Sequence, residues 1–430
     1  MGGALIAICS NPSLGPDVTV AELMDIGKYT TGGAIGGIHA YAVGTESLNR
    51  GNLDVAWCNN AGCQGGSSDE EHPVIAQNLY RWKLDSARPA GRFEQVGMSW
   101  LKHGFTALAG TEFCASCTFE GGHSSGDWLG QGCEDPYSSG LNGSQSSLGP
   151  RSEVNATSGQ FPYPWVNGGS GDSTLRKRML VAASDLADTA GQADELRYFA
   201  EGQYVARDDA EAGNAFNNAT FREVLVSGGS NIDFGGALGG YPGQQMQEAV
   251  RAWKRIDGEV EITRVDYAEN FLPARFNVAA RVHDNGDGTW RYEWAVHNLN
   301  SHRSAQAFSV PIATGASVNE PGFHGIDHHS GEPFSTADWG VTVDVFSVTW
   351  QSETYAQNPN ANALRWATMF NFWYDSDAPP GTGSATLTLF RDGGVGEPVT
   401  LNVQTIVPGA ACLHCDGFES SDTLRWSGAY

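Results

Sequence analysis

The segment between residues 322 and 332 concentrates side chains that can bind metal ions. It reads Gly-Phe-His-Gly-Ile-Asp-His-His-Ser-Gly-Glu and brings His324, Asp327 and His329 close together in the chain. Imidazole nitrogens and carboxylate oxygens are ligands that zinc and copper accept. Asp327 can instead accept a hydrogen bond that fixes a histidine tautomer. The segment predicts a copper or zinc site, and the alternative is a solvated loop whose histidines cap turns.

A complete metal site at this segment needs a ligand from elsewhere in the chain. His72, which precedes a proline, and His103, in the run Trp-Leu-Lys-His-Gly, both stand beside predicted aromatic strands. We therefore expect His72 and His103 to be the distant ligands, and the alternative for each is a partly buried histidine with satisfied hydrogen bonds. Calcium is a further expectation for the acidic, amide-rich stretch 201–218, because calcium prefers oxygen ligands.

Two other patterns lack the context that their chemistry needs. The run from Asp284 to Gly288 has calcium-loop residues, but strand-like segments flank it directly and predict a hairpin turn. The run Gly122-His-Ser-Ser-Gly126 matches the G-x-S-x-G pattern of hydrolases, whose serine stands between a buried strand and a helix. Neither flank predicts these elements, so we expect no serine nucleophile there.

Aromatic residues in polar loops suggest a flat ligand. Such rings can stack on sugars while neighbouring amides and acids bind the hydroxyl groups. The candidates are Trp128, Trp165, Trp339 and Tyr355. An extracellular glycan or other polymer is the expected partner, and the alternative is that these rings fill the interior of disulfide-closed loops.

The cysteines indicate an oxidising environment. Eight of them lie at short spacings in Gly- and Ser-rich surroundings: Cys9, Cys58, Cys63, Cys114, Cys117, Cys133, Cys412 and Cys415. Such loops bury little apolar surface, and disulfides order them in exported proteins. We predict disulfides, and the alternative is a four-thiolate zinc site made by the CxxC pairs at 114–117 and 412–415.

The N-terminus and the charge point outside the cytoplasm. The apolar run at residues 4–8 resembles the end of a signal peptide, and a lipid anchor on Cys9 is an alternative, although Ile8 stands where a small residue is required. A net charge of −24 excludes nucleic acid as a partner. No stretch approaches the about 20 apolar residues of a transmembrane segment. We expect a secreted or cell-surface protein.

Composition and patterning predict a mostly β protein. The 55 glycines and 17% charged residues favour tight turns and short strands. We expect antiparallel β-sandwich domains of the immunoglobulin-like or jelly-roll type, a disulfide-closed loop layer, and one or two short helices near 174–188 and 244–255. The clearest element is a hairpin of strands 276–282 and 290–298, in which Trp290, Tyr292, Trp294 and Val296 share one face.

The pattern divides the chain into six parts. They are a signal-peptide remnant (1–15), an N-terminal β domain (16–109), a Gly/Ser/Cys-rich loop layer (110–172), a mixed connecting region with short helices (173–257), a C-terminal β-sandwich (258–407) and a sorting-like tail (408–430). The tail run from Cys415 to Ser427 resembles the GFE-x-x-D-x-x-x-W-S ends of uncharacterised exported proteins of environmental bacteria. That resemblance covers the tail alone and implies export or surface sorting.

Two functional hypotheses remain open at this stage. The first is an exported protein that binds copper or zinc near His324, Asp327 and His329 and acts as an enzyme on an extracellular substrate. The second is a non-catalytic surface or matrix protein that binds glycan or further copies of itself. Acidity, disulfides and the tail suit both hypotheses, and the histidine cluster favours the first.

Overall fold

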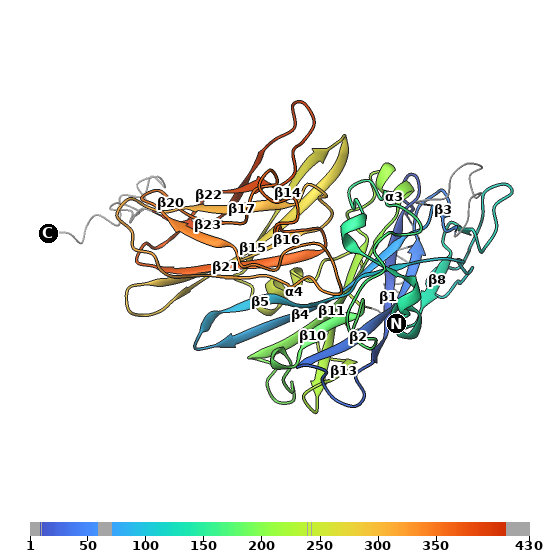
Figure 1. Ribbon diagram of the computed structural model, residues 1–430, viewed down its shortest axis with the longest axis horizontal. Helices are drawn as coiled ribbons and strands as arrows, with labels where there is room; N and C mark the ends of the chain where they lie inside the picture. Colours follow the sequence, from blue (N-terminus) through green and yellow to red (C-terminus); the bar gives the residue numbers. More distant parts are fainter. Residues whose placement is uncertain (1–8, 10, 59–70, 239, 242, 410–430) are drawn as a thin grey trace, which may run out of the picture.

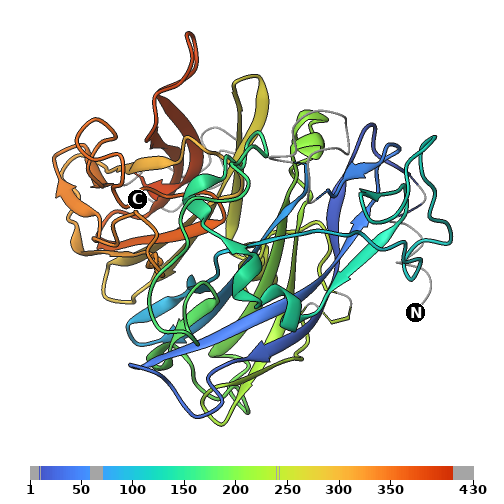
Figure 2. The ribbon, with the colours of Figure 1, turned by 45° about the vertical axis from the view of Figure 1, so that its right-hand side comes forward.

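The computed structural model describes residues 9, 11–58, 71–238, 240–241 and 243–409. Strands dominate this part of the chain, and its helices are short. The prediction of a mostly β, antiparallel protein is therefore confirmed. Two units lie side by side, an N-terminal one in blue and green and a C-terminal one in yellow to red (Figures 1 and 2).

The N-terminal unit is built around one antiparallel sheet, which has eleven strands within the described residues (Figure 1). Eight follow one another in the order β1 (Val18–Lys28), β2 (Ile38–Asn49), β10 (Met179–Ala182), β5 (Arg88–Met98), β4 (Val74–Asp85), β11 (Leu196–Val205), β12 (Ala219–Ser227) and β13 (Asn231–Phe234). Beside this path pair β6 (Leu101–His103), β8 (Glu134–Tyr137) and β9 (Leu148–Gly149). The sheet curls until β1 contacts β11, β12 and β13. Tyr41, Tyr198 and Tyr204 belong to the apolar core inside the curl.

The C-terminal unit is the predicted β-sandwich. One sheet has the order β14 (Glu261–Glu269), β15 (Leu272–Asp284), β16 (Trp290–Asn298), β21 (Thr368–Ser376) and β18 (Asn319–His324). The other has the order β19 (Gly340–Val343), β20 (Ser347–Gln351), β17 (Ala305–Pro311), β22 (Pro380–Leu389) and β23 (Thr400–Pro408). The predicted hairpin is confirmed as β15 and β16. All four residues expected on one face of β16 contribute to the core between the sheets.

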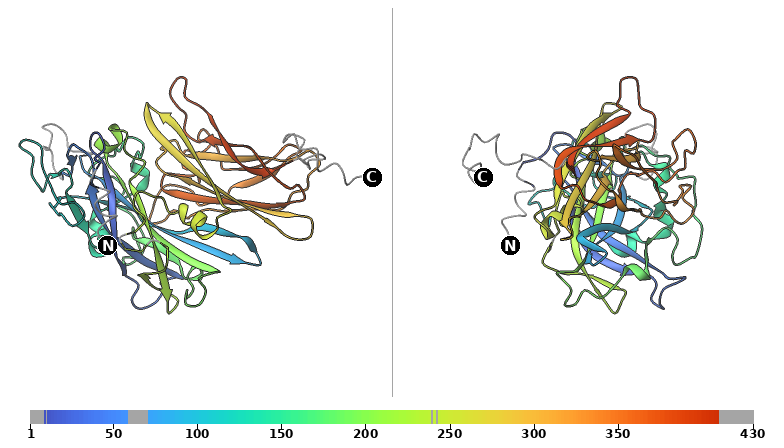
Figure 3. Two further views of the ribbon diagram at one scale, coloured as in Figure 1. Left: turned by 180° about the vertical axis from the view of Figure 1, so that it is seen from behind. Right: turned by 90° about the vertical axis from the view of Figure 1, so that its left-hand side faces the viewer.

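The two units meet along a seam that the left view of Figure 3 shows. The outer face of the N-terminal sheet packs against the sandwich sheet that contains β16 and β21, and Phe93, Phe199 and Met369 are among the buried residues there. Arg92 crosses the seam and forms two hydrogen bonds of 2.8 Å to the carboxylate of Glu293. The seam therefore combines apolar burial with a fully buried ion pair.

Residues 173–257 supply strands to the N-terminal sheet, although the sequence pattern suggested a separate connecting region. β10 pairs with both β2 and β5, and β11 pairs with β4 along its whole length. The helix expected at 174–188 is replaced by turns and β10, because pairing with two strands outweighs a weak helical pattern. The helix expected at 244–255 is reduced to α4 (Arg251–Ile256), which buries Trp253.

The remaining elements are short, and some of them lie outside the loop layer. They are the strand pair β3 (Val55–Ala56) and β7 (Trp128–Leu129), the helices α2 (Ser139–Asn142) and α3 (Arg207–Glu211), and the 3-10 turns η1 (Gln145–Ser147), η2 (Arg151–Glu153) and η3 (Ala183–Asp185). Across the described ranges, no helix is long and apolar enough to cross a membrane.

Disulfides order the loop layer as predicted. Cys9 is bonded to Cys114 and Cys117 to Cys133, and Cys58 is also disulfide-bonded. Because Cys114 and Cys117 belong to different disulfides, the four-thiolate zinc alternative is excluded. The bonded thiol of Cys9 likewise excludes the lipid-anchor alternative, which needs a free sulfur. The remaining cysteines, at 63, 412 and 415, lie outside the described residues.

Candidate metal centre

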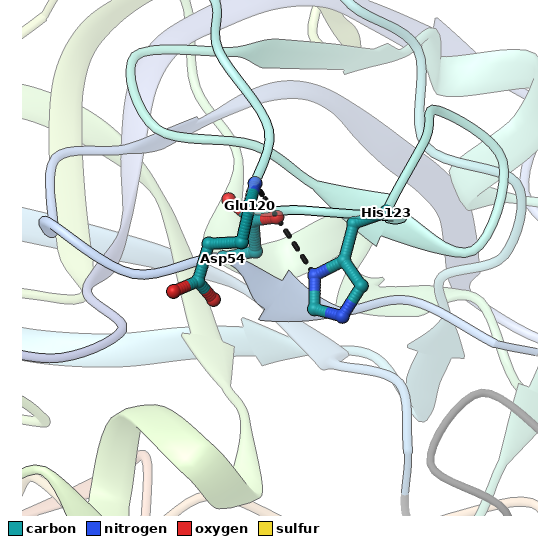
Figure 4. A group of neighbouring side chains, drawn as sticks. All are labelled: Asp54, Glu120 and His123. Atoms are coloured by element: carbon teal, nitrogen blue, oxygen red, sulfur yellow. Dashed lines mark hydrogen bonds and ion pairs between the residues drawn. The ribbon is translucent and has the colours of Figure 1, made fainter.

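Asp54, Glu120 and His123 bring metal-binding atoms together at the edge of the loop layer (Figure 4). One ligand atom from each lies within 4.8 Å of the other two, and the described part of the chain holds no second group of this kind. Oδ2 of Asp54 accepts a hydrogen bond from Nδ1 of His123 at 2.9 Å and one from the backbone N–H of Glu120 at 2.9 Å. A neutral His123 then has its lone pair on Nε2.

Local pairing and a disulfide hold these three residues. Asp54 directly precedes β3, and β3 pairs with β7. Glu120 and His123 lie in the hairpin 117–133, which the Cys117–Cys133 disulfide closes at its base. Trp128, at the start of β7, stacks on the ring of His123 with a centroid distance of 3.7 Å and an interplanar angle of 4°. The imidazole is therefore held between a carboxylate and an indole ring.

Asp54 has an unusual environment for a carboxylate. Its side chain is 0% exposed, and its Oδ1 atom has no hydrogen-bond partner. No Lys or Arg of the described residues forms an ion pair with Asp54 or Glu120. A buried carboxylate without a cation is costly, because the desolvation of the charge is not repaid. A cation bound among the three residues would supply that missing partner.

The donor set fits zinc or copper. Three protein ligands of mixed nitrogen and oxygen type, with further positions open, are typical of zinc sites that also bind water or substrate. Copper(II) accepts the same donors, whereas calcium prefers oxygen ligands throughout. Glu120 and His123 are half-buried, so the cluster can be reached from solvent.

This cluster was not predictable from the sequence, for a physical reason. Asp54 and His123 are 69 positions apart in the chain, and neither lies in a dense run of metal-binding residues. The local pattern at His123 is G-x-S-x-G, which points to a serine nucleophile and not to a metal ligand. Only the pairing of β3 with β7 brings the two segments together.

His72 and His103, the expected distant ligands, hydrogen-bond to each other. Nε2 of His72 lies 2.8 Å from Nδ1 of His103, and Nδ1 of His72 donates to the Cys58 carbonyl at 3.1 Å. Burial lowers the pKa of His72 to about 3 and holds the pKa of His103 well below its ordinary value. Both imidazoles are therefore neutral, and His103 donates its Nδ1–H to His72.

His324 and His329 contact the N-terminal sheet across the seam. Nε2 of His324 donates to the Gln95 carbonyl at 3.1 Å, and Nε2 of His329 donates to the Met98 carbonyl at 2.9 Å. Asp327 is exposed. Within the described ranges, none of these three joins His72 or His103 in a group of three metal-binding side chains. A metal site at these residues stays a prediction.

The four candidate stacking residues differ in exposure. Trp128 and Trp339 are 8% and 3% exposed. These two rings are therefore buried, whereas stacking on a ligand requires rings that face solvent. Trp339 packs on Phe323 with a centroid distance of 5.7 Å. Trp165 and Tyr355 are half-buried. Ligand stacking therefore stays a prediction for Trp165 and Tyr355.

Comparison with known proteins gives no family for this chain. No family model matches it, and no curated protein matches it. A solved structure titled "Biofilm associated protein - B domain" aligns at 11% identity over 92% of this chain and 88% of that chain, with a TM-score of 0.16. A likeness at that score carries no argument about fold or function.

Proposed function

We propose that the protein is an extracellular, disulfide-ordered β protein that binds a zinc or copper ion at Asp54, Glu120 and His123. The observation that carries this proposal is the buried, unpartnered Oδ1 atom of Asp54 beside a second carboxylate and an imidazole. When bound, such an ion can act as a Lewis acid at its open coordination positions. Asp54 and Glu120 would supply carboxylate oxygens to the ion, and His123 would supply an imidazole nitrogen.

The extracellular location is supported by covalent chemistry. Two disulfides close the loop layer, and disulfides persist in oxidising compartments. The excess of 49 acidic over 25 basic residues favours a soluble, highly charged surface. The tail resemblance from Cys415 to Ser427 points the same way, and an extracellular glycan or other polymer is part of this proposal as its substrate or binding partner.

Metal titration of the purified, metal-stripped chain tests the site. We expect about one zinc or copper ion per chain by calorimetry and elemental mass spectrometry, with an affinity that falls at least tenfold in Glu120→Gln and in His123→Gln. His283→Gln serves as the matched control, because this half-buried histidine lies outside the cluster and its loss should leave the titration unchanged.

A second variant pair separates this site from the one expected at residues 324–329. If His324→Ala with His329→Ala abolishes binding and His123→Gln does not, the ligands are those expected from the local sequence and Asp54 has a structural role. The proposed centre is refuted if no metal binds at any ratio. It is also refuted if neither the Glu120→Gln and His123→Gln variants nor the variant with His324→Ala and His329→Ala changes the metal content.

A second candidate function is self-association through an edge of the sandwich. All four residues of β19 are exposed, and Val341 and Val343 lie among them. β19 pairs with β20 on one side, and a free strand edge can pair with another copy of itself. Sedimentation of the wild type and of Val343→Lys tests this function. A monomer at all concentrations for both proteins would refute it.

A further inference from the structure

Three arginines line one small cavity between the loop layer and the sandwich. Arg151 comes from η2, whereas Arg365 and Arg391 come from the C-terminal unit. The other polar residues of the lining are Ser152, His302, Ser304 and Trp366. The cavity has room for about one water molecule or a monatomic ion.

Arg365 has donors that nothing in the described residues accepts. It is 4% exposed, and its guanidinium stacks on Phe334 with a distance of 3.9 Å to the ring centroid. Nη2 donates to the carbonyls of Pro359 at 3.2 Å and Ala361 at 3.0 Å. Its Nε and Nη1 atoms have no hydrogen-bond partner.

Trp366 adds another unpaired donor to the same cavity. It is also 4% exposed, and its Nε1 has no hydrogen-bond partner. Buried N–H groups that lose water without gaining an acceptor are unfavourable. Arg365 and Trp366 both line the cavity, and both have buried N–H groups without a hydrogen-bond acceptor.

The charges around the cavity are unbalanced. None of the three arginines forms an ion pair with a carboxylate in the described part of the chain, although the protein carries 49 acidic residues. Glu332 is close, but its oxygens accept backbone N–H groups of Arg151 and Ser152. The guanidinium of Arg151 instead donates to neutral acceptors, among them the Ser99 carbonyl.

The pKa values of two lining residues are lowered, which is consistent with a positive electrostatic potential in the cavity. Burial, followed by the nearby charge of Arg391, lowers the pKa of Arg365 to about 9. Burial and the charges of Arg391 and Arg365 lower the pKa of His302 to about 3. An anion in the cavity would oppose both effects, since it favours the charged form of each group.

We propose that this cavity is a binding site for a small monatomic anion of the chloride class. The ion would accept hydrogen bonds from Arg365 and Trp366 and compensate the charges of the three arginines. A phosphate or carboxylate group exceeds the space available. This site is independent of the metal centre, because it shares no residue with Asp54, Glu120 or His123.

Bromide replaces chloride chemically and can be located by its anomalous scattering. Crystals of the full chain grown or soaked in sodium bromide should show an anomalous peak in the cavity, in contact with Arg365 and Trp366. The absence of a peak there, with sodium bromide in large excess over the protein, would overturn the proposal.

A solution measurement keeps the test independent of crystals. With a chelator present, we expect the Tm of the wild type to be about 1 to 3 °C higher in sodium chloride than in sodium gluconate at equal ionic strength. Arg365→Met should lose this difference, while the methionine side chain still fills the space beside Phe334. Arg178→Met is the matched control, because Arg178 also stacks on a ring, at 3.7 Å from the Tyr29 centroid.

The outcomes divide cleanly. Loss of the chloride effect in Arg365→Met but not in Arg178→Met supports the site. Equal chloride effects in the wild type and both variants overturn it, and so does a wild type that responds to neither chloride nor bromide. If Arg365→Met fails to fold, the bromide experiment on the wild type still decides.

Discussion

Glu46 offers a sharp test of the electrostatics of the loop layer. It lies in β2 and is 5% exposed. Burial raises its pKa to about 8, and the carboxylates of Glu134, Glu112, Glu22 and Asp135 contribute to the same shift. Replacing it by glutamine keeps the shape of the side chain and removes the charge at every pH. We therefore expect Glu46→Gln to stabilise the protein in alkaline solution.

The magnitude follows from the difference between the folded and unfolded states. A pKa of 4.5 in the unfolded chain and about 8 in the folded protein corresponds to about 5 kcal/mol at about 1.36 kcal/mol per pH unit. Glu112 is exposed, and solvent screens part of the repulsion, so we expect about 2 kcal/mol. The stability that the protonated Glu46 provides is fully present below pH 4.5 and is lost as the pH rises through about 8.

Urea denaturation of the wild type and Glu46→Gln from pH 4.5 to 9, with a chelator present, measures this effect. The two free energies of unfolding should agree near pH 4.5 and differ by about 2 kcal/mol in favour of the variant near pH 9. Glu211→Gln is the control, because Glu211 is exposed in α3 and pairs with Arg207. Parallel pH curves for the wild type and Glu46→Gln would refute the reasoning.

Three further changes test other parts of the structure. Arg92→Met leaves the buried Glu293 with only the more distant Arg291, at 3.8 Å, and should cost about 3 kcal/mol in chemical denaturation. A double variant that also carries Glu293→Gln should recover part of the loss, and no recovery would contradict the ion pair. Removing the disulfide with Cys117→Ser and Cys133→Ser should cost about 3 kcal/mol and weaken metal binding, and unchanged affinity would show that the hairpin is ordered without it. Burial lowers the pKa of His329 to about 4, so the stability that its neutral form provides is present above pH 6.5 and lost as the pH falls through about 4. In His329→Gln the loss of stability between pH 6.5 and 4 should be smaller by about 2 kcal/mol, and an unchanged loss would contradict this.

The fold was predictable where its signal is local. Alternation along β16 placed Trp290, Tyr292, Trp294 and Val296 on one face, and this face lies in the sandwich core. The assembly of the N-terminal sheet was not predictable in the same way. β10 has four residues and lies between strands from two distant segments, so its position depends on contacts that no local pattern records.

The candidate site likewise combines features that a local sequence pattern predicts with features that depend on long-range contacts. The histidine run at 324–329 is recognisable because several metal-binding side chains stand close together in the sequence. The sequence does not show which groups accept hydrogen bonds from these histidines. The carbonyls of Gln95 and Met98 that receive His324 and His329 belong to a strand more than 200 positions away. Asp54 and His123 stand apart in the chain, and only folding makes them neighbours.

The seam between the two units has a consequence for how the molecule can be divided. Side chains of the sandwich bond to main-chain atoms of β5: Asn371 donates to the Phe93 carbonyl, as His324 and His329 do to theirs. Gln95 in turn accepts the backbone N–H of Met369. An N-terminal fragment that ends at residue 257 would therefore expose unpaired backbone carbonyls of β5 as well as apolar rings. We therefore expect neither half to be stable alone and the two units to melt together.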